Sequence, residues 1–211
     1  MKIGIIGAGN VGGALGKLWA AKGHEIVFGV PDPRAAKYQE LVKSTGNKAK
    51  AGSVQDAASF GEVVVLATPW PATKAAIEAA GDLTGKILVD CINPLKPDLS
   101  GLAIGNDNSA GEEVARWAKG AKVVKAFNTI GAMNFADPRF GSETADMLIC
   151  GDDASGKKTV AALAADLGFN PVDTGALTCS RLLEPLAMLW IHLAIKQGWG
   201  PTGHAFKLLR R

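Results

Sequence analysis

Three glycines near the start of the chain have the type and spacing that could bind a phosphate group. Gly7, Gly9 and Gly12 fall in the pattern G-x-G-x-x-G within the stretch "IGIIGAGNVGG". The apolar run before them predicts a buried strand, and the residues after them predict a helix. At such a turn, glycines let the backbone approach a pyrophosphate closely, and the helix start adds positive potential. The spacing alone also fits a tight turn, but this context favours a dinucleotide site.

Four later segments, each at the end of a predicted strand, add further candidates. They read "GVPDPR", "ATPWP", "DCINP" and "AFNTIG". Ligands of open α/β sheets bind beyond the carboxyl ends of the strands, and the prolines leave nearby backbone groups free for a ligand. The alternative is that these prolines only end strands. The candidate binding residues at these ends are Val30, Pro31, Arg34, Ala67, Thr68, Pro69, Trp70, Asn93, Asn128, Thr129 and Ile130.

The first of these segments bears on the choice between NAD and NADP. An acidic residue there binds the ribose 2′-hydroxyl of NAD, whereas an arginine accommodates the 2′-phosphate of NADP. Asp32 lies 20 residues after Gly12, and Arg34 follows in the same loop. Asp32 could equally be a turn residue between two prolines, and Arg34 an ordinary residue of the next helix. The sequence therefore leaves both dinucleotides open.

The elements that must position these residues alternate along the chain. Apolar strands followed by helices require a parallel sheet that is covered on both faces. We expect an α/β fold, a Rossmann-type doubly wound and mainly parallel sheet, formed by residues 1–175. Residues 176–211 are expected to form a helical C-terminal extension, with one long helix over residues 179–198 and further helix over residues 199–209. The expected strands are residues 2–6, 24–29, 62–68, 86–94, 121–129, 145–150 and 169–173, and the expected core helices are residues 10–23, 34–44, 70–80, 111–118 and 155–168.

Composition excludes several functional classes. The 211 residues carry 23 basic and 20 acidic side chains, a net charge of +3, without the concentrated basic face that nucleic-acid binding requires. The three cysteines are far apart, which argues against a zinc site or a disulfide framework and favours a reducing compartment. The start of the chain lacks the pattern of a secretory signal, and "PLAMLWIHLAI" is too short to span a bilayer. We therefore expect a cytoplasmic protein with no nucleic-acid, membrane or metal partner.

Several motifs together resemble the family of NADPH-dependent F420 reductases, which is related to the cytosolic domain of six-transmembrane ferric reductases. The motifs are "IGIIGAGNVG", "GHEIVFG", "ATPWPAT", "VKAFNTIGA", "ICGDD" and "TGALTCSRLLEPLAMLWI". The last two lie outside the generic dinucleotide-binding half. The resemblance implies a nicotinamide dinucleotide lying across the strand ends, with a flavin or deazaflavin (F420) stacked on its nicotinamide ring.

The resemblance also implies roles for particular residues. Ala8, Gly9, Asn10 and Val11 would cradle the pyrophosphate. Residues 68–70 would flank the adenosine or nicotinamide side, and residues 128–130 would lie near the two rings. NADP-using members commonly read "GSR" where this chain has Gly29, Val30 and Pro31, so the usual 2′-phosphate contacts are replaced here and Arg34 is the candidate substitute.

A few side chains outside these segments could also do chemistry. Arg181 and Glu184 are spaced to form an ion pair within one helix, although Arg181 could instead meet an anionic substrate. His192 could donate a proton or be a structural residue of an apolar helix, and the segment "GWGPTGHAF" could close over a ring or form a bend at the subunit surface. We expect Cys91 to be a buried core residue, and Asp152 and Asp153 to cap a helix.

Three functions fit these patterns. The first is hydride transfer between NADP(H) and a flavin or F420-type partner, in which the protein needs no catalytic side chain because the cofactors carry the chemistry. The second is reduction of a small carbonyl or imine, which needs a proton donor such as His192. The third is a dinucleotide sensor without turnover. For the enzyme functions we expect a small-molecule redox partner, and the apolar C-terminal helix leads us to expect a homodimer.

Overall fold

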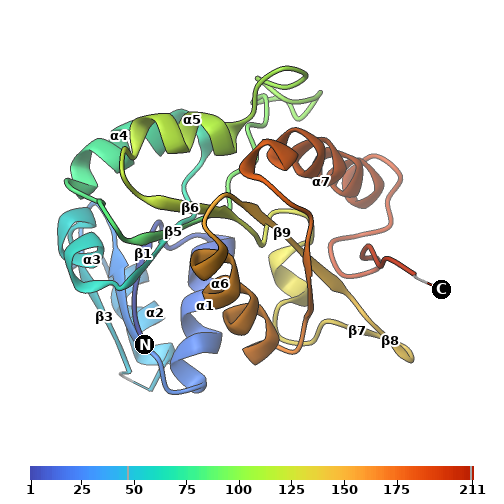
Figure 1. The fold of residues 1–211 in the computed structure, drawn as a ribbon. Coiled ribbons are helices and arrows are strands. Elements are labelled where there is room, and N and C mark those ends of the chain that lie inside the picture. Colours follow the sequence, from blue (N-terminus) through green and yellow to red (C-terminus); the bar gives the residue numbers. More distant parts are fainter. Residues whose placement is uncertain (47, 210) are drawn as a thin grey trace.

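An eight-stranded sheet forms the centre of the protein in a computed structural model that describes residues 1–46, 48–209 and 211 (Figure 1). Its strand order is β10-β9-β6-β5-β4-β1-β2-β3, which contains the 3-2-1-4-5-6 order of dinucleotide-binding folds. The strands from β1 to β6 are parallel, whereas β9 joins β6 in the antiparallel direction. The strands of the sheet are β1 (Lys2–Ile6), β2 (Glu25–Gly29), β3 (Ala49–Gly52), β4 (Val63–Leu66), β5 (Ile87–Asp90), β6 (Lys122–Lys125), β9 (Asp146–Gly151) and β10 (Asn170–Asp173). A small hairpin pairs β7 (Arg139–Phe140) with β8 (Glu143–Thr144).

Helices cover both faces of this sheet. Figure 1 shows α4 and α5 on one face and α1 and α6 on the other, with α7 beside α5. The α-helices are α1 (Asn10–Ala21), α2 (Ala36–Ser44), α3 (Val54–Phe60), α4 (Trp70–Ala80), α5 (Ala110–Trp117), α6 (Ala154–Asp166) and α7 (Ser180–Ile195). Two short 3-10 turns, Ala132–Asn134 and Leu177–Cys179, follow β6 and precede α7.

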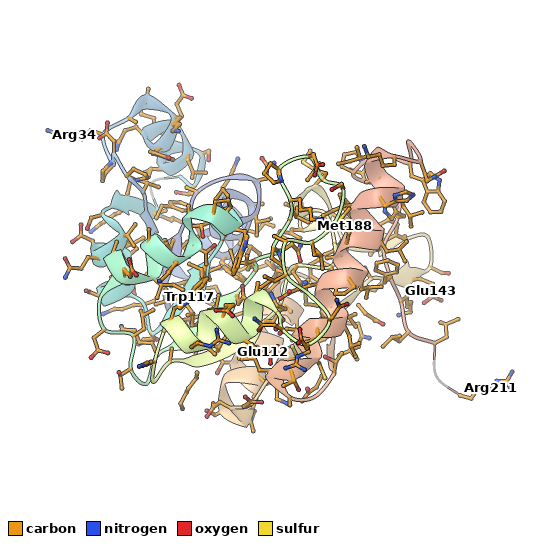
Figure 2. All side chains as sticks on the ribbon, turned by 90° about the horizontal axis from the view of Figure 1, so that it is seen from above. Arg34, Glu112, Trp117, Glu143, Met188 and Arg211 are labelled. Carbon is orange, nitrogen blue, oxygen red and sulfur yellow. The ribbon has the colours of Figure 1, made fainter. Side chains whose placement is uncertain are left out.

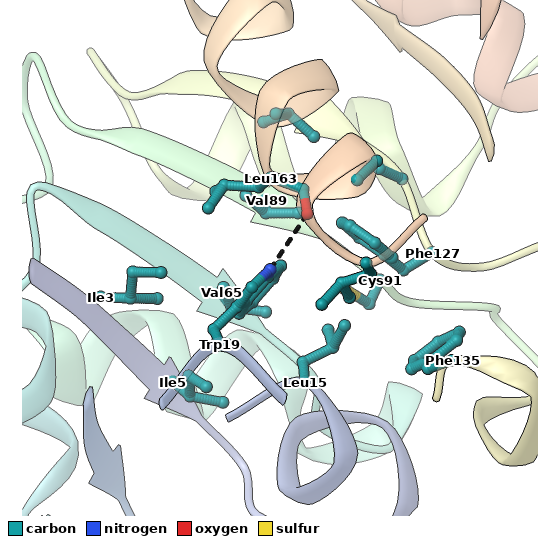
Figure 3. Packing of buried hydrophobic residues seen from close by; sticks show 14 of the residues in the cluster. Ile3, Ile5, Leu15, Trp19, Val65, Val89, Cys91, Phe127, Phe135 and Leu163 are labelled. Atoms are coloured by element: carbon teal, nitrogen blue, oxygen red, sulfur yellow. Dashed lines mark hydrogen bonds between the residues drawn. The ribbon is translucent and has the colours of Figure 1, made fainter. Parts of the chain in front are cut away.

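The core is divided in two because successive strand residues point to opposite faces of the sheet. Ile5 and Val65 belong to the cluster beneath α1 and α6, whereas their neighbours Ile6 and Leu66 belong to the cluster beneath α4 and α5. In the first cluster, Trp19 of α1 donates a hydrogen bond from its indole Nε1 to the carbonyl oxygen of Leu163, at 3.1 Å (Figure 3). This bond joins α1 to α6 across the sheet face, so the two helices are fixed relative to each other.

The structure confirms the doubly wound, mainly parallel sheet and also shows elements that the sequence pattern does not predict, among them the β7–β8 hairpin, β3 and α3. Strand β3 and helix α3 lie within residues 49–60, to which the sequence analysis assigns no strand or helix. Strand β3 is a short edge strand of small and charged residues, so it lacks the apolar run that identifies the inner strands.

The predicted helical extension is confirmed for α7 and wrong for residues 199–209. The described residues after Ile195 form turns and extended segments. Gly198 and Gly200 have φ angles of 71° and 78°, in the left-handed region, and Pro201 lacks the N–H that a helix needs.

Candidate functional site

The predicted strand ends meet along one edge of the sheet. Backbone hydrogen bonds continue the ladder past the strands: Gly7 N–H donates to the carbonyl of Gly29 at 3.1 Å, and Ala67 N–H donates to the carbonyl of Ile6 at 2.9 Å. Cys91 N–H bonds to Leu66 O at 3.1 Å, and Ala126 N–H bonds to Asp90 O at 3.1 Å. These bonds place the loops after β1, β2, β4, β5 and β6 side by side. Strands β1 and β4, where the strand order reverses, lie at the middle of this edge.

The glycine loop has the geometry of a phosphate cradle. Gly7 has a φ angle of 95°, and a Cβ there would lie 2.6 Å from the carbonyl oxygen of Ala67. A Cβ on Gly12 would overlap the carbonyl oxygen of Gly7, whereas one on Gly9 would meet no other atom within 4 Å. Gly9 is the N-cap of α1, and neither a side-chain cap nor an acidic first-turn residue competes for the helix N–H groups. These residues fit a pyrophosphate.

The loop after β2 is fixed by Asp32, whose Oδ1 accepts a hydrogen bond from Arg34 N–H at 3.1 Å. This is the turn role that the sequence left open for Asp32. Val30 is buried, Pro31 is exposed, and the exposed Arg34 projects from the outer edge of the protein (Figure 2). Beside this loop, a cavity of about 550 Å³ lies between α1 and α2 and reaches Ala8, Gly9 and Asn10 of the cradle.

The loop after β4 contacts the glycine loop through Thr68. The Cγ2 atom of Thr68 lies 3.3 Å from the position of a Cβ on Gly7, and its Oγ1 shares a hydrogen bond with Thr73 Oγ1 at 3.1 Å. Pro69 is the N-cap of α4. The indole of Trp70 instead stacks on Trp117 of α5, with ring centroids 5.3 Å apart. The ring of Trp70 therefore packs against α5, and a contact between Trp70 and the cofactor stays a prediction.

A second cavity, of about 360 Å³, lies where the nicotinamide end is expected. It shares Asn10 and Val11 with the cradle. The nicotinamide end of a dinucleotide whose pyrophosphate is bound on the cradle can therefore reach this cavity. Among the predicted residues, Asn93, Asn128 and Ile130 also line this cavity, whereas Thr129 is buried and is not part of the lining. We call it the ring pocket; its remaining lining residues are Cys91, Leu95, Phe127, Gly131, Ala132, Met133, Trp190, Ile191 and Pro201.

Two asparagines fix the floor of the ring pocket. Asn93 Nδ2 donates to the backbone carbonyl of Asn128 at 2.9 Å, and Asn128 Nδ2 donates to Asn93 Oδ1 at 3.1 Å and to the carbonyl of Leu183 at 3.3 Å. Backbone carbonyls only accept, so both amide orientations are determined. Asn128 Oδ1 is left as a buried acceptor with no partner in the described residues. The amide pair connects the ends of β5 and β6 to α7.

Backbone strain helps to position Asn128. The preceding residue, Phe127, has a φ angle of 62°, which is rare for a bulky side chain and costs about 1–3 kcal/mol. The ring of Phe127 is buried and packs edge-to-face on Trp19 and Phe135, with centroids 5.6 and 5.9 Å away (Figure 3). This packing offsets the strain and turns the chain at the end of β6 toward the ring pocket.

Comparison with known proteins identifies the family. Residues 2–94 match the family described as NADP oxidoreductase, coenzyme F420-dependent. The chain is 33% identical over 217 residues to the F420-dependent NADP reductase of Methanocaldococcus jannaschii, and the match covers 96% of each protein. The chain belongs to the F420-dependent NADP reductase family. It is thus, by family, an NAD(P)-dependent oxidoreductase.

Two further similarities extend this result. The reductase is 33% identical over 193 residues to the rat metalloreductase STEAP3; the match covers 89% of this chain and only 37% of that relative's length. A crystal structure of an Arthrobacter protein, named as a candidate F420-dependent NADP reductase, superposes with a TM-score of 0.90 at 34% identity and covers 100% of both chains. In the described part of this reductase, no helix combines the length and apolar character needed to cross a membrane.

Three buried charges of the reductase join β5, β6 and α7 beneath the site. Lys125 Nζ lies 2.7 Å from Asp90 Oδ2, 3.1 Å from Glu184 Oε1 and 2.8 Å from the carbonyl oxygen of Ile92. All three side chains are at most 1% exposed. Burial alone would lower the pKa of Lys125, but the two carboxylates outweigh burial and hold this pKa above its ordinary value. Burial raises the pKa of Glu184, and the positive charge of Lys125 offsets only part of this increase.

The predicted ion pair between Arg181 and Glu184 is wrong. Glu184 points inward and accepts hydrogen bonds from the backbone N–H groups of Ala110 and Gly111, both at 3.0 Å, at the start of α5. Arg181 binds both carboxylate oxygens of Glu112, at 2.9 and 2.6 Å, so it is not free for an anionic substrate. Lys125 and the positive end of α5 bind Glu184 more favourably than a solvent-exposed arginine does. The hydrogen bonds from Ala110 and Gly111 to Glu184 join residues more than 70 positions apart in the sequence, and helical spacing cannot reveal such contacts.

The other candidate groups either lie outside the lining of the ring pocket or have structural roles. His192 is exposed, lies near Gln197 and does not line the ring pocket. Cys91 is buried, and burial followed by the charge of Asp90 raises the pKa of its thiol, which keeps it protonated. Asp153 caps α6 as predicted, whereas Asp152 accepts a hydrogen bond from Leu177 N–H at 2.9 Å and so is not a cap.

The segment after α7 supplies a wall of the ring pocket. Trp190 Nε1 donates to the carbonyl of His204 at 3.0 Å, His204 Nε2 lies 3.0 Å from the carbonyl of Trp190, and the two rings stack with centroids 4.7 Å apart. Asn134 Nδ2 donates to the carbonyl of Pro201 at 3.0 Å. Sequence analysis missed Trp190 as a site residue because an apolar helix position gives no sign of which cavity it faces.

Proposed function

We propose that this protein transfers hydride between NADP(H) and a flavin or deazaflavin ring of the F420 type. The observation that carries the proposal is the chemistry of the ring pocket. Its described lining consists of apolar residues, glycine, asparagines and a protonated thiol, and it includes no Asp, Glu, His, Lys or Arg. A pocket of this kind can orient two rings and exclude water, but its side chains cannot readily deliver a proton.

Hydride transfer between rings matches this lining. A bound nicotinamide supplies or accepts the hydride, so the protein needs to provide only orientation and a dry environment. Gly131 allows the indole of Trp190 to pack directly against the backbone of the loop after β6, since a Cβ on Gly131 would overlap this indole. Reduction of a carbonyl or imine requires a proton at the product heteroatom, and His192 does not line the pocket.

We propose that the dinucleotide lies across the strand ends, with its pyrophosphate on residues 7–12, its adenosine side between residues 30–34 and 67–70, and its nicotinamide near Asn93 and residues 128–130. NADP is favoured because it is the dinucleotide in the names of the matched family and of the Methanocaldococcus relative. NAD remains the alternative, because residues 29–31 differ from the pattern of NADP-using members.

We also propose the division of the chain and its assembly. Residues 1–175 form the dinucleotide-binding part, and residues 176–211 complete the ring pocket through Trp190, Ile191 and Pro201. A homodimer is expected through α7, because Leu182 and Leu189 are exposed and lie seven residues apart on one helix face. The free thiols of Cys91, Cys150 and Cys179 are consistent with a reducing cytoplasm.

The test is NADPH oxidation with a panel of acceptors: F420, FMN, FAD, ferric chelates, and small ketones and imines. We expect turnover with at least one ring acceptor and none with the ketones and imines. The variant His192→Ala should keep the ring activity, because His192 lies outside the pocket. Turnover with a ketone or imine that is lost in His192→Ala would support the carbonyl or imine reductase instead. Tight dinucleotide binding with no oxidation by any acceptor would support the sensor.

A further inference from the structure

The cavity between α1 and α2 is an extension of the phosphate cradle. One side is formed by Ala8, Gly9 and Asn10, and the other by Lys37, Tyr38 and further residues of α2. Because the first three residues also form the glycine loop, a dinucleotide bound on the cradle has part of its adenosine side at the mouth of this cavity. Its volume of about 550 Å³ leaves room for a substituent on the ribose.

The charges around this cavity favour an anion. Lys17 of α1 and Lys37 of α2 line it, against one carboxylate, Glu40. The Nζ of Lys37 lies 4.7 Å from the centre of the Tyr38 ring, so an aromatic face holds the cation near the cavity. Helix α2 begins at Ala36 without a side-chain cap and without an acidic residue in its first turn. The helix start and the ammonium of Lys37 therefore lie on the same side of the cavity.

The two residues that the sequence offered for recognition of the ribose do not line this cavity. Asp32 is exposed, and one of its carboxylate oxygens already accepts the N–H of Arg34. Arg34 is exposed and projects from the outer edge of the protein, away from Met188 of α7 and the ring pocket (Figure 2). Neither the NAD-type contact expected from Asp32 nor the NADP-type contact expected from Arg34 is therefore supported by the position of its side chain.

We infer that Lys37 binds the 2′-phosphate of NADP in the cavity between α1 and α2, and that it determines the preference for NADP over NAD. The inference rests on the proposed dinucleotide function and adds the residue that selects the cofactor. Lys17, two turns from the start of α1, adds to the positive potential, and the start of α2 contributes N–H groups. The serine and arginine common in NADP-using relatives are replaced here by a lysine that lies six residues after Pro31, in the first turn of α2.

The experiment is calorimetric binding of NADP and NAD to the full-length protein without an acceptor. Lys37→Met should weaken NADP about tenfold or more and leave NAD unchanged, because only NADP carries the extra phosphate. Arg34→Met should change the NADP-to-NAD ratio less than about threefold, since an exposed cation outside the cavity is screened. Lys43→Met, on the last turn of α2 and outside the cavity lining, is the matched control and should change neither affinity.

A second pair of probes isolates the phosphate. Adenosine 2′,5′-bisphosphate should bind more tightly than 5′-AMP to the wild type, and Lys37→Met should remove this difference. Equal weakening of NADP and NAD by Lys37→Met would overturn the inference and indicate a structural role. So would a loss of the NADP preference in Arg34→Met but not in Lys37→Met. Failure to bind either dinucleotide would overturn the proposed function as well, whereas NADP selection by Lys37 without turnover would overturn only the proposed hydride transfer.

Discussion

The buried lysine beneath the site gives the sharpest test of how the structure is held together. Replacing Lys125 by methionine keeps most of the side-chain volume but removes the cation between Asp90 and Glu184. Both carboxylates are at most 1% exposed, so neither can recover its lost partner from water. Breaking a buried ion pair costs about 3–5 kcal/mol, because an uncompensated charge remains. Glu184 retains two backbone N–H donors from α5, and Asp90 Oδ1 retains the N–H of Ile92 at 2.8 Å, whereas Asp90 Oδ2 is left without a partner among the described residues, so the larger part of the cost falls on Asp90.

The assay is reversible denaturant unfolding, with thermal melts as a second measure. We expect Lys125→Met to lose about 3–5 kcal/mol of unfolding free energy and roughly 10 °C in Tm. The matched control is Lys157→Met, which removes the lysine of a partly exposed pair, Lys157 to Asp173 at 2.9 Å. That variant should lose less than about 1 kcal/mol.

The dependence on pH provides an independent check of the cause. Burial already raises the pKa of Glu184, and loss of Lys125 raises it further. A carboxyl whose pKa is higher in the folded than in the unfolded state favours folding at low pH, and this stability is lost as pH rises through the folded pKa. The deficit of Lys125→Met should therefore be larger at about pH 8 than at about pH 5. A deficit below about 1 kcal/mol at every pH would refute the assignment of Lys125 as the neutralising charge.

Further predictions concern the cradle and the surface. Gly9→Val should cost no more than about 1 kcal/mol of unfolding free energy, because its Cβ meets open space and only the N-cap preference of glycine is lost. It should nevertheless weaken NADP at least about tenfold in calorimetry, because the side chain fills the phosphate position. Gly12→Ala should destabilise the fold itself in denaturant unfolding, since its Cβ overlaps the Gly7 carbonyl. The hydrogen bond from Arg181 lowers the pKa of Glu112, so this pair stabilises the protein above the ordinary carboxyl range and loses its effect as pH falls through the folded pKa. Glu112→Gln should therefore be up to about 1 kcal/mol less stable than wild type at neutral pH, and this difference should shrink as pH falls below the ordinary carboxyl range in an acid titration of unfolding.

Sequence alone predicts the parts of this fold that depend on local patterns. The glycine spacing, the apolar inner strands and the prolines after β4 and β5 predict the strand ends that the structure brings to one edge of the sheet, because each signal is contained within a few neighbouring residues. Helix α3 was missed although it carries such a signal: Ser53 and Asp56 form a capping box, with hydrogen bonds of 3.1 and 2.9 Å. Its seven residues contain too few large apolar side chains to show a clear helical period.

The remaining site features depend on contacts between distant segments. Glu184 reaches Lys125 and the start of α5, and Trp190 reaches the loop after β6; nothing local in α7 indicates either contact. The strained backbone of Phe127 is also set by its packing partners and not by its own preference. Lys37 differs from these, since a basic residue in the first turn after the β2 loop is visible in the sequence. Its importance depends on the cavity, which only the packing of α1 against α2 defines.

The hydrogen bonds and ring stacking between Trp190 and His204 hold one wall of the ring pocket, and this wall differs in local stability from the phosphate cradle. The cradle connects the central strand β1 to helix α1, whose Leu15 and Trp19 are fully buried, so opening it requires the loss of core packing. The wall carrying Pro201 is fastened by a few hydrogen bonds and one ring stack, so it can detach at a smaller free energy. Under the proposed function, affinity for the ring partner scales with the fraction of molecules in which this wall is closed. On warming, the protein should therefore lose its acceptor before it loses its dinucleotide.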